Sequence, residues 1–445
     1  MSSTVLLDGV SLSREQLVSV ARGASIELSA RALKDVARAA GFLAEQVRRE
    51  EPIYGVSTGF GSNADKLLGG HPMRDAAVDA AAPGRSLHVE LQHNLIVTHA
   101  VCVGTPFAPD VVRAMLCIRI NTLLRGHSGI RVETLQALAA MLNAGIVPVV
   151  PQLGSVGASG DLAPLSHLAI VLIGGGEAFF AGERMAGALA LERAGLQPVA
   201  LSYKEGLALN NGTAQMLATG VLALHKLDEL LETADLAAAM TIDAFAGRLG
   251  AFAEEVHELR PHPGQVRTAA NLRSMLAGST LTDIRYHLVP RFRQWQRDSW
   301  SMFTNGILPD GDGGVTPRQP SFDIGWEWVP FDQRHGRDRF YKRFLPFRGG
   351  KKHQPQDSYS LRCVPQVHGA VRDAVEQAKR VFDIELNAVT DNPLVFPDAN
   401  AEHVEQQVIS AGHFHGMPLA LAMSYVKAAI PVLASISERR LNKLL

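Results

Sequence analysis

The chain has 445 residues, too many for one compact core and enough for two or three domains. Its 43 basic and 44 acidic residues leave a net charge of −1, which gives no general attraction to nucleic acid or to anionic membranes. Three cysteines, no CxxC or HExxH spacing, no signal-peptide pattern and no eighteen-residue apolar run argue against disulfide-rich, metal-dependent, secreted and membrane-spanning classes. We therefore expect a soluble cytoplasmic protein.

Two helical patterns open the chain. Ser13 and Gln16 form a capping box for a short helix, and Ser29 caps a longer one that reaches about residue 50. A glycine-rich stretch then follows at 53–61. Its glycines among aromatic residues indicate a mobile flap, although a surface loop with a packed Tyr54 fits the same letters.

Three more helical patterns cover about 86–103, 110–125 and 132–144. The first of them carries Thr98 and His99. Taken alone, a histidine in a helix is more often a packing residue than a ligand contact.

A second glycine-rich loop, GSVGASGDLAP at 154–164, leads into an apolar helix that Asp161 is placed to cap. A plain connection is one interpretation. A serine-hydrolase elbow needs Gly-x-Ser-x-Gly, and a phosphate loop ends in Gly-Lys-Ser/Thr, so neither matches well. A third interpretation is ring formation, in which the amide nitrogen of Gly160 attacks the carbonyl carbon of Ala158. Loss of two waters then leaves Ser159 as a dehydroalanine within a methylideneimidazolone, an electrophile.

Beyond this loop, turn residues at 176–203 predict a small hairpin, and a long helical pattern runs from 204 to about 246. Residues 285–352 differ in character, because they hold all four tryptophans and more basic than acidic residues. Helices return at 365–390 and 416–445. The last pattern reaches the end of the chain without a glycine, asparagine or proline to stop it, and we interpret it as cut.

The string GSVGASGDLAPLSHLA resembles the signature of the aromatic amino-acid ammonia-lyases, which include histidine, phenylalanine and tyrosine lyases and related aminomutases. Four further strings are similar to that family: YGVSTGFG from Tyr54, KEGLALNNGT around Asn211, QDSYSLRC from Gln356, and TDNPL around Asn392. Two positions depart from it, since Asn210 replaces an apolar residue and His413 replaces an asparagine. The resemblance covers nearly all of the chain outside 285–352, which we predict to be an insertion.

The resemblance implies the roles of individual residues. Tyr54 acts as the catalytic base and Tyr359 assists proton transfer, while Arg362 holds the substrate carboxylate through a bidentate fork. By the same resemblance, His99 contacts the ring of the substrate, and Asn211 contacts both the substrate and the cofactor ring. Gln356 orients groups around the ring, and Asn392 is a second contact to the substrate carboxylate. Without the flanking motifs, a surface ion pair for Arg362 and a helix cap for Asn211 would be the simpler interpretations.

We predict a mainly α fold, a long-helix bundle of the fumarase and aspartase type with a small N-terminal domain carrying the cofactor loop. The predicted domains are 1–203, a bundle from 204–284 and 353–445, and the basic insertion 285–352. The resemblance implies a homotetramer whose active sites are shared between subunits, with no external cofactor, metal, nucleic-acid or membrane partner. It also implies that family members continue beyond residue 445, so the bundle is incomplete here.

The expected reaction is elimination of ammonia from an L-aromatic amino acid. Histidine giving trans-urocanate is favoured, because a small polar residue before His99 resembles the histidine ammonia-lyase arrangement. Phenylalanine or tyrosine ammonia-lyase, tyrosine 2,3-aminomutase, and a catalytically inactive truncated relative remain alternatives. A serine hydrolase acting through Ser159 is the weakest of them.

Overall fold

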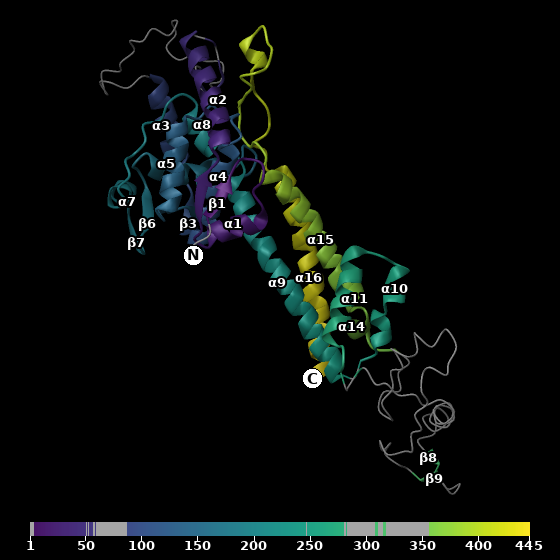
Figure 1. Ribbon diagram of the computed structural model, residues 1–445. Coiled ribbons are helices and arrows are strands. Elements are labelled where there is room, and N and C mark those ends of the chain that lie inside the picture. Colours follow the sequence, from purple (N-terminus) through teal and green to yellow (C-terminus); the bar gives the residue numbers. More distant parts are fainter. Residues whose placement is uncertain are drawn as a thin grey trace. The chain divides into compact units, whose positions relative to one another are not determined.

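Helices dominate the chain, as the sequence predicts (Figure 1). The computed structural model describes residues 4–49, 51, 53–56, 58, 87–245, 247–279, 282, 308–309, 315–316 and 356–445. The chain divides into two units, which we call unit 1 (residues 1–225 and 378–423) and unit 2 (226–377 and 424–445). These units follow contacts in space, and the predicted domain organisation stays a prediction.

Unit 1 packs short strand pairs against helices. β1 and β2 pair in parallel, β3 pairs with β5, and β4, β6 and β7 form an antiparallel sheet. The elements of this unit are β1 (Thr4–Leu7), α1 (Arg14–Ala21), β2 (Ser25–Leu28), α2 (Ala30–Arg48), α3 (Leu87–His99), β3 (Val103–Pro106), α4 (Pro109–Leu123), α5 (Val132–Asn143), β4 (Val147–Pro148), β5 (Pro151–Leu153), α6 (Leu162–Leu172), β6 (Glu177–Phe180), β7 (Glu183–Ala186), α7 (Gly187–Arg193), α8 (Glu205–Asn210), β10 (Leu394–Val395), η4 (Val404–Gln406) and β11 (Val408–Ile409).

The local signals of the N-terminal region are confirmed. The capping box at α1 is complete, because the Ser13 N–H donates to Gln16 Oε1 at 2.8 Å and the Gln16 N–H donates to Ser13 Oγ at 3.2 Å. Ser29 caps α2 through the Ala32 N–H, and β6 and β7 form the predicted hairpin. These features depend on contacts between near neighbours, which a sequence pattern specifies directly.

The long helical pattern from residue 204 is two helices. α8 ends at Asn210, a turn covers 211–213, and α9 (Ala214–Ala244) then runs from unit 1 into unit 2. α15 (Val364–Glu385) and α16 (Met417–Leu444) likewise contribute to both units. Unit 2 is completed by η2 (Leu249–Phe252), α10 (Glu254–Glu258), α11 (Pro263–Met275), β8 (Leu308–Pro309), β9 (Val315–Thr316) and α14 (Tyr359–Arg362). Apart from β8 and β9, the predicted insertion 285–352 lies outside the described residues.

An apolar core joins the helices of unit 2. Ala238 on α9, Leu272 on α11, Leu361 on α14, Val364 on α15 and Ile436 on α16 pack into one buried cluster. Burial of a valine, leucine or isoleucine side chain contributes about 1.5–3 kcal/mol, so the cluster is a principal source of stability in this unit.

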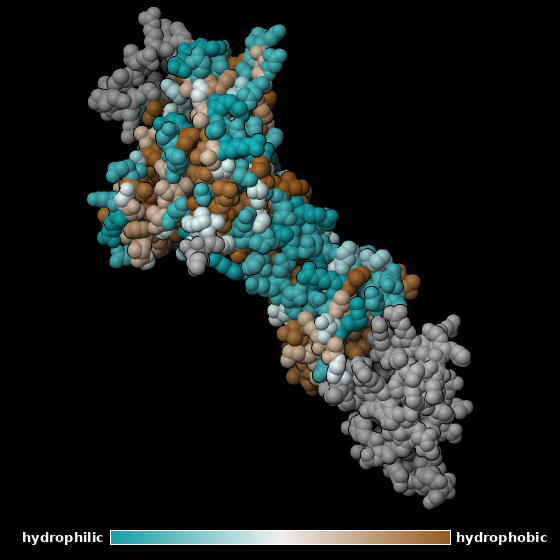
Figure 2. All heavy atoms as spheres, viewed as in Figure 1, coloured by the Kyte–Doolittle hydropathy of each residue, from teal (hydrophilic) through white to brown (hydrophobic). Residues whose placement is uncertain are grey.

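α16 keeps much of its apolar surface exposed. On the face drawn in Figure 2, hydrophobic residues gather beside the C-terminus marked in Figure 1. Among the described helices, α16 is the one long and apolar enough to cross a membrane by length and composition, a test that core helices of soluble proteins also pass. The exposed apolar residues on it are Met417, Leu421, Tyr425, Val432, Leu441 and Leu444.

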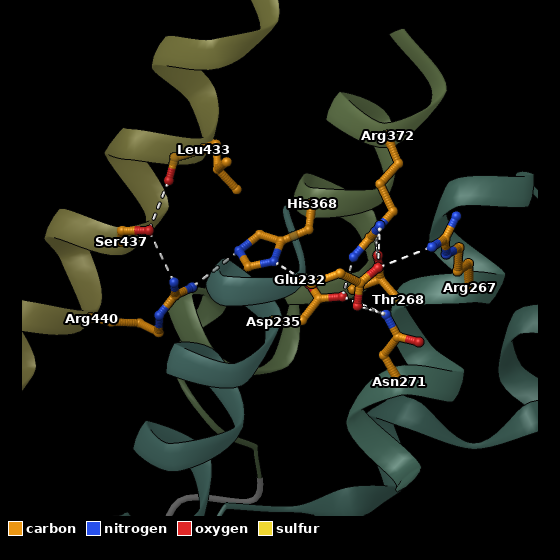
Figure 3. A network of polar contacts seen from close by, with 10 residues as sticks. All are labelled: Glu232, Asp235, Arg267, Thr268, Asn271, His368, Arg372, Leu433, Ser437 and Arg440. Carbon is orange, nitrogen blue, oxygen red and sulfur yellow. Dashed lines mark hydrogen bonds and ion pairs between the residues drawn. The ribbon is translucent and has the colours of Figure 1, made fainter. Parts of the chain in front are cut away.

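A buried polar network also links the helices of unit 2 (Figure 3). Asp235 on α9 is fully buried and accepts from His368 Nδ1 at 2.7 Å and Arg372 Nη2 at 2.6 Å on α15. It also accepts from Asn271 Nδ2 on α11 at 2.8 Å. Arg440 on α16 reaches His368 Nε2 at 3.4 Å. The network therefore connects four helices through one carboxylate.

The charges in this network are consistent with one tautomer of His368. Burial lowers the pKa of His368, so the ring is neutral near pH 7. Its Nδ1–H donates to Asp235 and its Nε2 accepts from Arg440. Burial alone would raise the pKa of Asp235, but the hydrogen bonds from His368 and Asn271 and the charge of Arg372 outweigh it and lower that pKa.

We predict that Asp235→Ala destabilises the protein by about 3–5 kcal/mol, because it leaves Arg372 buried without its buried partner. Glu232→Ala is the matched control, since Glu232 pairs with the same Arg372 but is 45% exposed in its side chain. Its loss should cost about 1 kcal/mol or less. Urea unfolding followed by circular dichroism measures both, and equal midpoints for the two variants would contradict the account.

Candidate functional site

The tripeptide predicted to form the cofactor, Ala158-Ser159-Gly160, lies in a tight loop of unit 1 between β5 and α6. Gly157 and Gly160 have φ angles of 72° and 74°, in the left-handed region that favours glycine. Ala158 and Ser159 are exposed while Gly160 is buried. A Cβ on Gly160 would lie 2.5 Å from the carbonyl oxygen of Gly212, so no other residue fits there without movement.

The turn between α8 and α9 holds this loop. Asn211 Nδ2 donates to the Ser159 carbonyl oxygen at 3.2 Å, and the Asp161 N–H donates to the Gly212 carbonyl oxygen at 2.7 Å. The Asn211 side chain is therefore in direct contact with the tripeptide, and its predicted role toward ring and substrate stays a prediction. The Oδ1 atom of Asn211 is buried and has no hydrogen-bond partner among the described residues.

Asp161 caps a different helix from the one expected. Its side chain makes no capping bond to α6, which it precedes. Instead Oδ2 accepts from the Gln215 and Met216 N–H groups at 2.8 and 2.9 Å, in the first turn of α9, and Oδ1 accepts from Ser155 Oγ at 2.5 Å. The carboxylate thus joins both ends of the loop to the N-terminus of α9.

Cys102 packs against the start of the loop, at Gly154. A Cβ on Gly154 would lie 2.2 Å from Cys102 Sγ, so the glycine permits close packing on the thiol. The Cys102 N–H donates to Nε2 of His167, on α6, at 3.1 Å. Burial lowers the pKa of His167 and raises that of Cys102 to about 11, so both groups are neutral packing residues near pH 7.

Tyr54 lies in a turn that a buried glutamine ties to α8. Gln92, on α3, donates from Nε2 to the Gly55 carbonyl oxygen at 3.2 Å and accepts from the Gly206 N–H at 3.0 Å. Gln92 is fully buried. It therefore fixes the backbone beside Tyr54 to the helix that ends at the Asn211 turn. Four residues of the predicted flap, 57 and 59–61, lie outside the described residues.

His99 and Asn392 both lie in unit 1, and each side chain is held by a hydrogen bond to the backbone. His99 ends α3 and its Nδ1 bonds the Leu95 carbonyl oxygen at 2.8 Å, which places the proton on Nδ1 and leaves Nε2 as an acceptor in the neutral ring. Asn392 Oδ1 accepts from the Ala411 N–H at 2.7 Å. This bond does not use the amide nitrogen of Asn392, which is the side-chain group able to donate to a carboxylate.

Gln356, Tyr359 and Arg362 belong to unit 2, at and before α14. Gln356 is exposed, and Tyr359 is 70% exposed. The Arg362 guanidinium lies 4.6 Å from the centroid of the Tyr359 ring, a cation–π contact. Its Nε atom is buried without a hydrogen-bond partner, and no described carboxylate forms an ion pair with it.

A buried cationic group behind the turn was not predicted. Arg119, on α4, donates from Nε to the Ala208 carbonyl oxygen at 2.7 Å and from Nη1 to the Thr390 carbonyl oxygen at 2.8 Å. Lys204 pairs with Asp391 at 2.7 Å, and both side chains are fully buried. An arginine inside the apolar run AMLCIRINTLL was the available signal, because buried charges are rare unless paired.

The two departures from the family strings have different surroundings. Asn210 is fully buried and donates from Nδ2 to Ser166 Oγ at 3.1 Å, while its Oδ1 has no hydrogen-bond partner in the part of the chain that the structure describes. His413 is exposed and lies near Glu385. Burial raises the pKa of the Glu385 carboxyl, and the charge of His413 opposes this with a smaller lowering effect.

Comparison with known proteins decides the family. The model of the aromatic amino acid lyase family matches residues 12–445. The chain belongs to this family. It is 42% identical to a histidine ammonia-lyase of Symbiobacterium thermophilum over 98% of this chain and 69% of that protein. Similar solved structures include tyrosine aminomutase from Streptomyces globisporus, with TM-score 0.78, 33% identity and coverage of 100% and 71%. Histidine ammonia-lyase from Trypanosoma cruzi has TM-score 0.72, 31% identity and coverage of 99% and 67%.

Membership confirms the predicted fold and reaction class. The mainly α lyase fold is that of the solved relatives, and the family places this chain among the carbon–nitrogen lyases. The chain spans about 70% of the length of the relatives just described. The roles assigned to individual site residues stay predictions.

We predict that Asp161 makes stability depend on pH. Burial raises the pKa of Asp161 from 3.8 to about 6, so the folded protein binds more protons than the unfolded chain between these values. Stability should therefore fall by about 3 kcal/mol as the pH rises from 4 to 6, and level off above that. Urea unfolding of wild type and Asp161→Asn across this range isolates the contribution of Asp161. Identical pH profiles for the two proteins would show that the pKa is not raised.

Proposed function

We propose that this chain eliminates ammonia from L-histidine to give trans-urocanate, using a 4-methylidene-imidazol-5-one formed from Ala158, Ser159 and Gly160. The observation that carries the proposal is the tripeptide in a loop whose close backbone packing admits only glycine at position 160. The 42% identity to a histidine ammonia-lyase supports the substrate.

The residues present fit the ring. Gly160 has no side chain to obstruct its nitrogen, Ala158 is small, and Asn211 fixes the carbonyl of the residue between them. Ser159 is exposed, so its β-carbon is accessible to a substrate. The ring supplies an electrophilic double bond, which makes the substrate amine a better leaving group.

The remaining chemistry belongs to side chains. Tyr54 removes the β-proton, the electrons of that C–H bond form the Cα=Cβ bond, and the C–N bond breaks to release ammonia. Tyr359 assists proton transfer near the amine. Its contact with Arg362 keeps these two side chains together in unit 2.

Binding of the amino acid uses directional polar groups. Arg362 offers its guanidinium to the substrate carboxylate, which the absence of a described ion-pair partner supports. Asn392 offers its amide nitrogen as a second contact, and Gln356 orients groups around the ring. His99 Nε2 is an acceptor for an imidazole N–H, which favours histidine over phenylalanine.

A second candidate is tyrosine 2,3-aminomutase, which the similarity to the Streptomyces globisporus structure supports. An imidazole N–H and a phenol O–H are both donors to His99 Nε2, so the same side chain suits either substrate. The aminomutase returns ammonia to the β-carbon, whereas the lyase releases it.

We also propose that the protein is a cytoplasmic homotetramer with shared active sites. The exposed apolar residues of α16 support this, because association would bury them. We propose no nucleic-acid or membrane partner, because a net charge of −1 gives no general electrostatic attraction to either.

We predict that Gly160→Ala prevents ring formation, because its Cβ would meet the Gly212 carbonyl oxygen at 2.5 Å. Gly182→Ala is the matched control, since Gly182 also has positive φ (84°) but nothing lies within 4 Å of its Cβ. Mass spectrometry of the folded variants should find a loss of two waters only in the control. Loss of two waters from all Gly160→Ala chains would contradict the role given to this packing.

Turnover tests the proposed activity. Ser159→Ala and Tyr54→Phe should each reduce urocanate formation from histidine by at least about 10³-fold, because each removes a group that acts on the reacting atoms. Ultraviolet absorbance follows the unsaturated product, with tyrosine and phenylalanine as competing substrates. Chromatography that finds a β-amino acid from tyrosine and no urocanate from histidine would establish the aminomutase instead.

A further inference from the structure

We propose that Thr213 and Glu385 are a positioning pair that holds the 211–213 turn in the geometry needed for ring closure. This inference rests on the proposed function, because it concerns how the ring forms. Thr213 Oγ1 donates to Glu385 Oε1 at 2.6 Å, and Thr213 is 1% exposed. The two residues lie 172 positions apart in the sequence.

The 211–213 turn contacts the tripeptide loop and constrains its backbone. Ring closure requires the Gly160 nitrogen to reach the Ala158 carbonyl carbon. A new N–C bond forms, and the carbonyl oxygen leaves as water with the amide hydrogens of Gly160 and Ser159, which leaves a C=N bond from the Ala158 carbon to the Ser159 nitrogen. Ser159 then loses its hydroxyl and its Cα hydrogen as a second water. Bonds from Asn211 and Gly212 constrain the backbone on both sides of this bond-forming step. A displaced turn would displace the attacking nitrogen.

Thr213 has an unusual arrangement for its position. It immediately precedes α9, where a threonine ordinarily accepts a hydrogen bond from an N–H of the first helical turn. Asp161 already accepts from the Gln215 and Met216 N–H groups. The Thr213 hydroxyl is therefore not needed to cap α9, and it instead donates a hydrogen bond to Glu385.

Glu385 lies where a negative charge is energetically unfavourable, which indicates that a specific contact keeps it there. It is the last residue of α15, where the helix dipole disfavours negative charge. Burial raises its pKa, and its charge in turn raises the pKa of Asp161. A carboxylate at this position destabilises its own helix. Its hydrogen bond to Thr213 in the 211–213 turn gives a reason for its presence there.

The turn is closed in from its other side by Arg119. A Cβ on Gly212 would lie 2.4 Å from Arg119 Nη1 and 2.5 Å from the Thr390 carbonyl oxygen. The Arg119 guanidinium is itself fixed by the Ala208 and Thr390 carbonyl oxygens. Because the turn is closely packed against Arg119 and Thr390, we infer that the Thr213–Glu385 bond sets the distance between the turn and Gly160.

The test is the cyclised fraction, measured by intact-protein mass spectrometry on material that is soluble and shows native helical circular dichroism. Thr213→Val and Glu385→Met remove the bond from opposite sides, and each should leave a large fraction of chains heavier by two waters. Thr213→Ser and Glu385→Gln keep a donor and an acceptor and should cyclise as wild type does. Asp383→Ala is the matched control, since it removes an exposed carboxylate two residues away whose partner is Arg14.

The outcomes are separable. If wild type itself shows no loss of two waters, the proposed ring is absent and the proposed function fails. If wild type, Thr213→Val and Glu385→Met are all fully cyclised, the ring stands and the positioning pair is overturned. Should one of the two disruptive variants not fold, the other tests the same bond. Incomplete cyclisation in the Asp383→Ala control as well would equally overturn a specific role for Glu385.

Discussion

The candidate site depends on the contact between the loop at 154–161 and the N-terminus of α9. Asp161 supplies this contact by accepting two N–H groups of α9 while its own N–H donates to Gly212. A buried carboxylate that is fully hydrogen-bonded specifies one geometry, because any displacement leaves its charge unpaired in a medium of low dielectric constant. The unusual backbone at Gly157 and Gly160 persists because this contact fixes both ends of the loop.

Charge around the turn is divided between two sides. Arg119 and Lys204 lie buried behind it with Asp391 as the paired anion, and Asp161 and Glu385 lie at the N-terminus of α9. Burial lowers the pKa of both cations and raises the pKa of both carboxyls at the helix. Each group is retained at a cost in solvation, which is expected where precise placement matters more than stability.

Local features of the fold could be predicted from the sequence, and long-range contacts could not. The capping box at Ser13, the hairpin after residue 176 and the glycine loop depend on neighbouring residues, and each is confirmed. The partner of Asp161 was predicted wrongly, because the N–H groups it accepts lie 54 and 55 residues away and a capping pattern considers only the adjacent helix. Thr213 and Glu385 are ordinary letters in helical surroundings, and only the fold brings them together. The family strings identified Asn211, but its contact with Ser159 required the structure.

The central claim is that three residues of this chain become one ring. A crystal structure of the purified wild-type protein, at a resolution that separates bonded atoms, tests it most directly. The account predicts continuous electron density joining the Gly160 nitrogen to the Ala158 carbonyl carbon, with a planar methylidene carbon in place of the Ser159 side chain. Density for an open tripeptide with an intact serine hydroxyl, in fully assembled protein, would contradict the account.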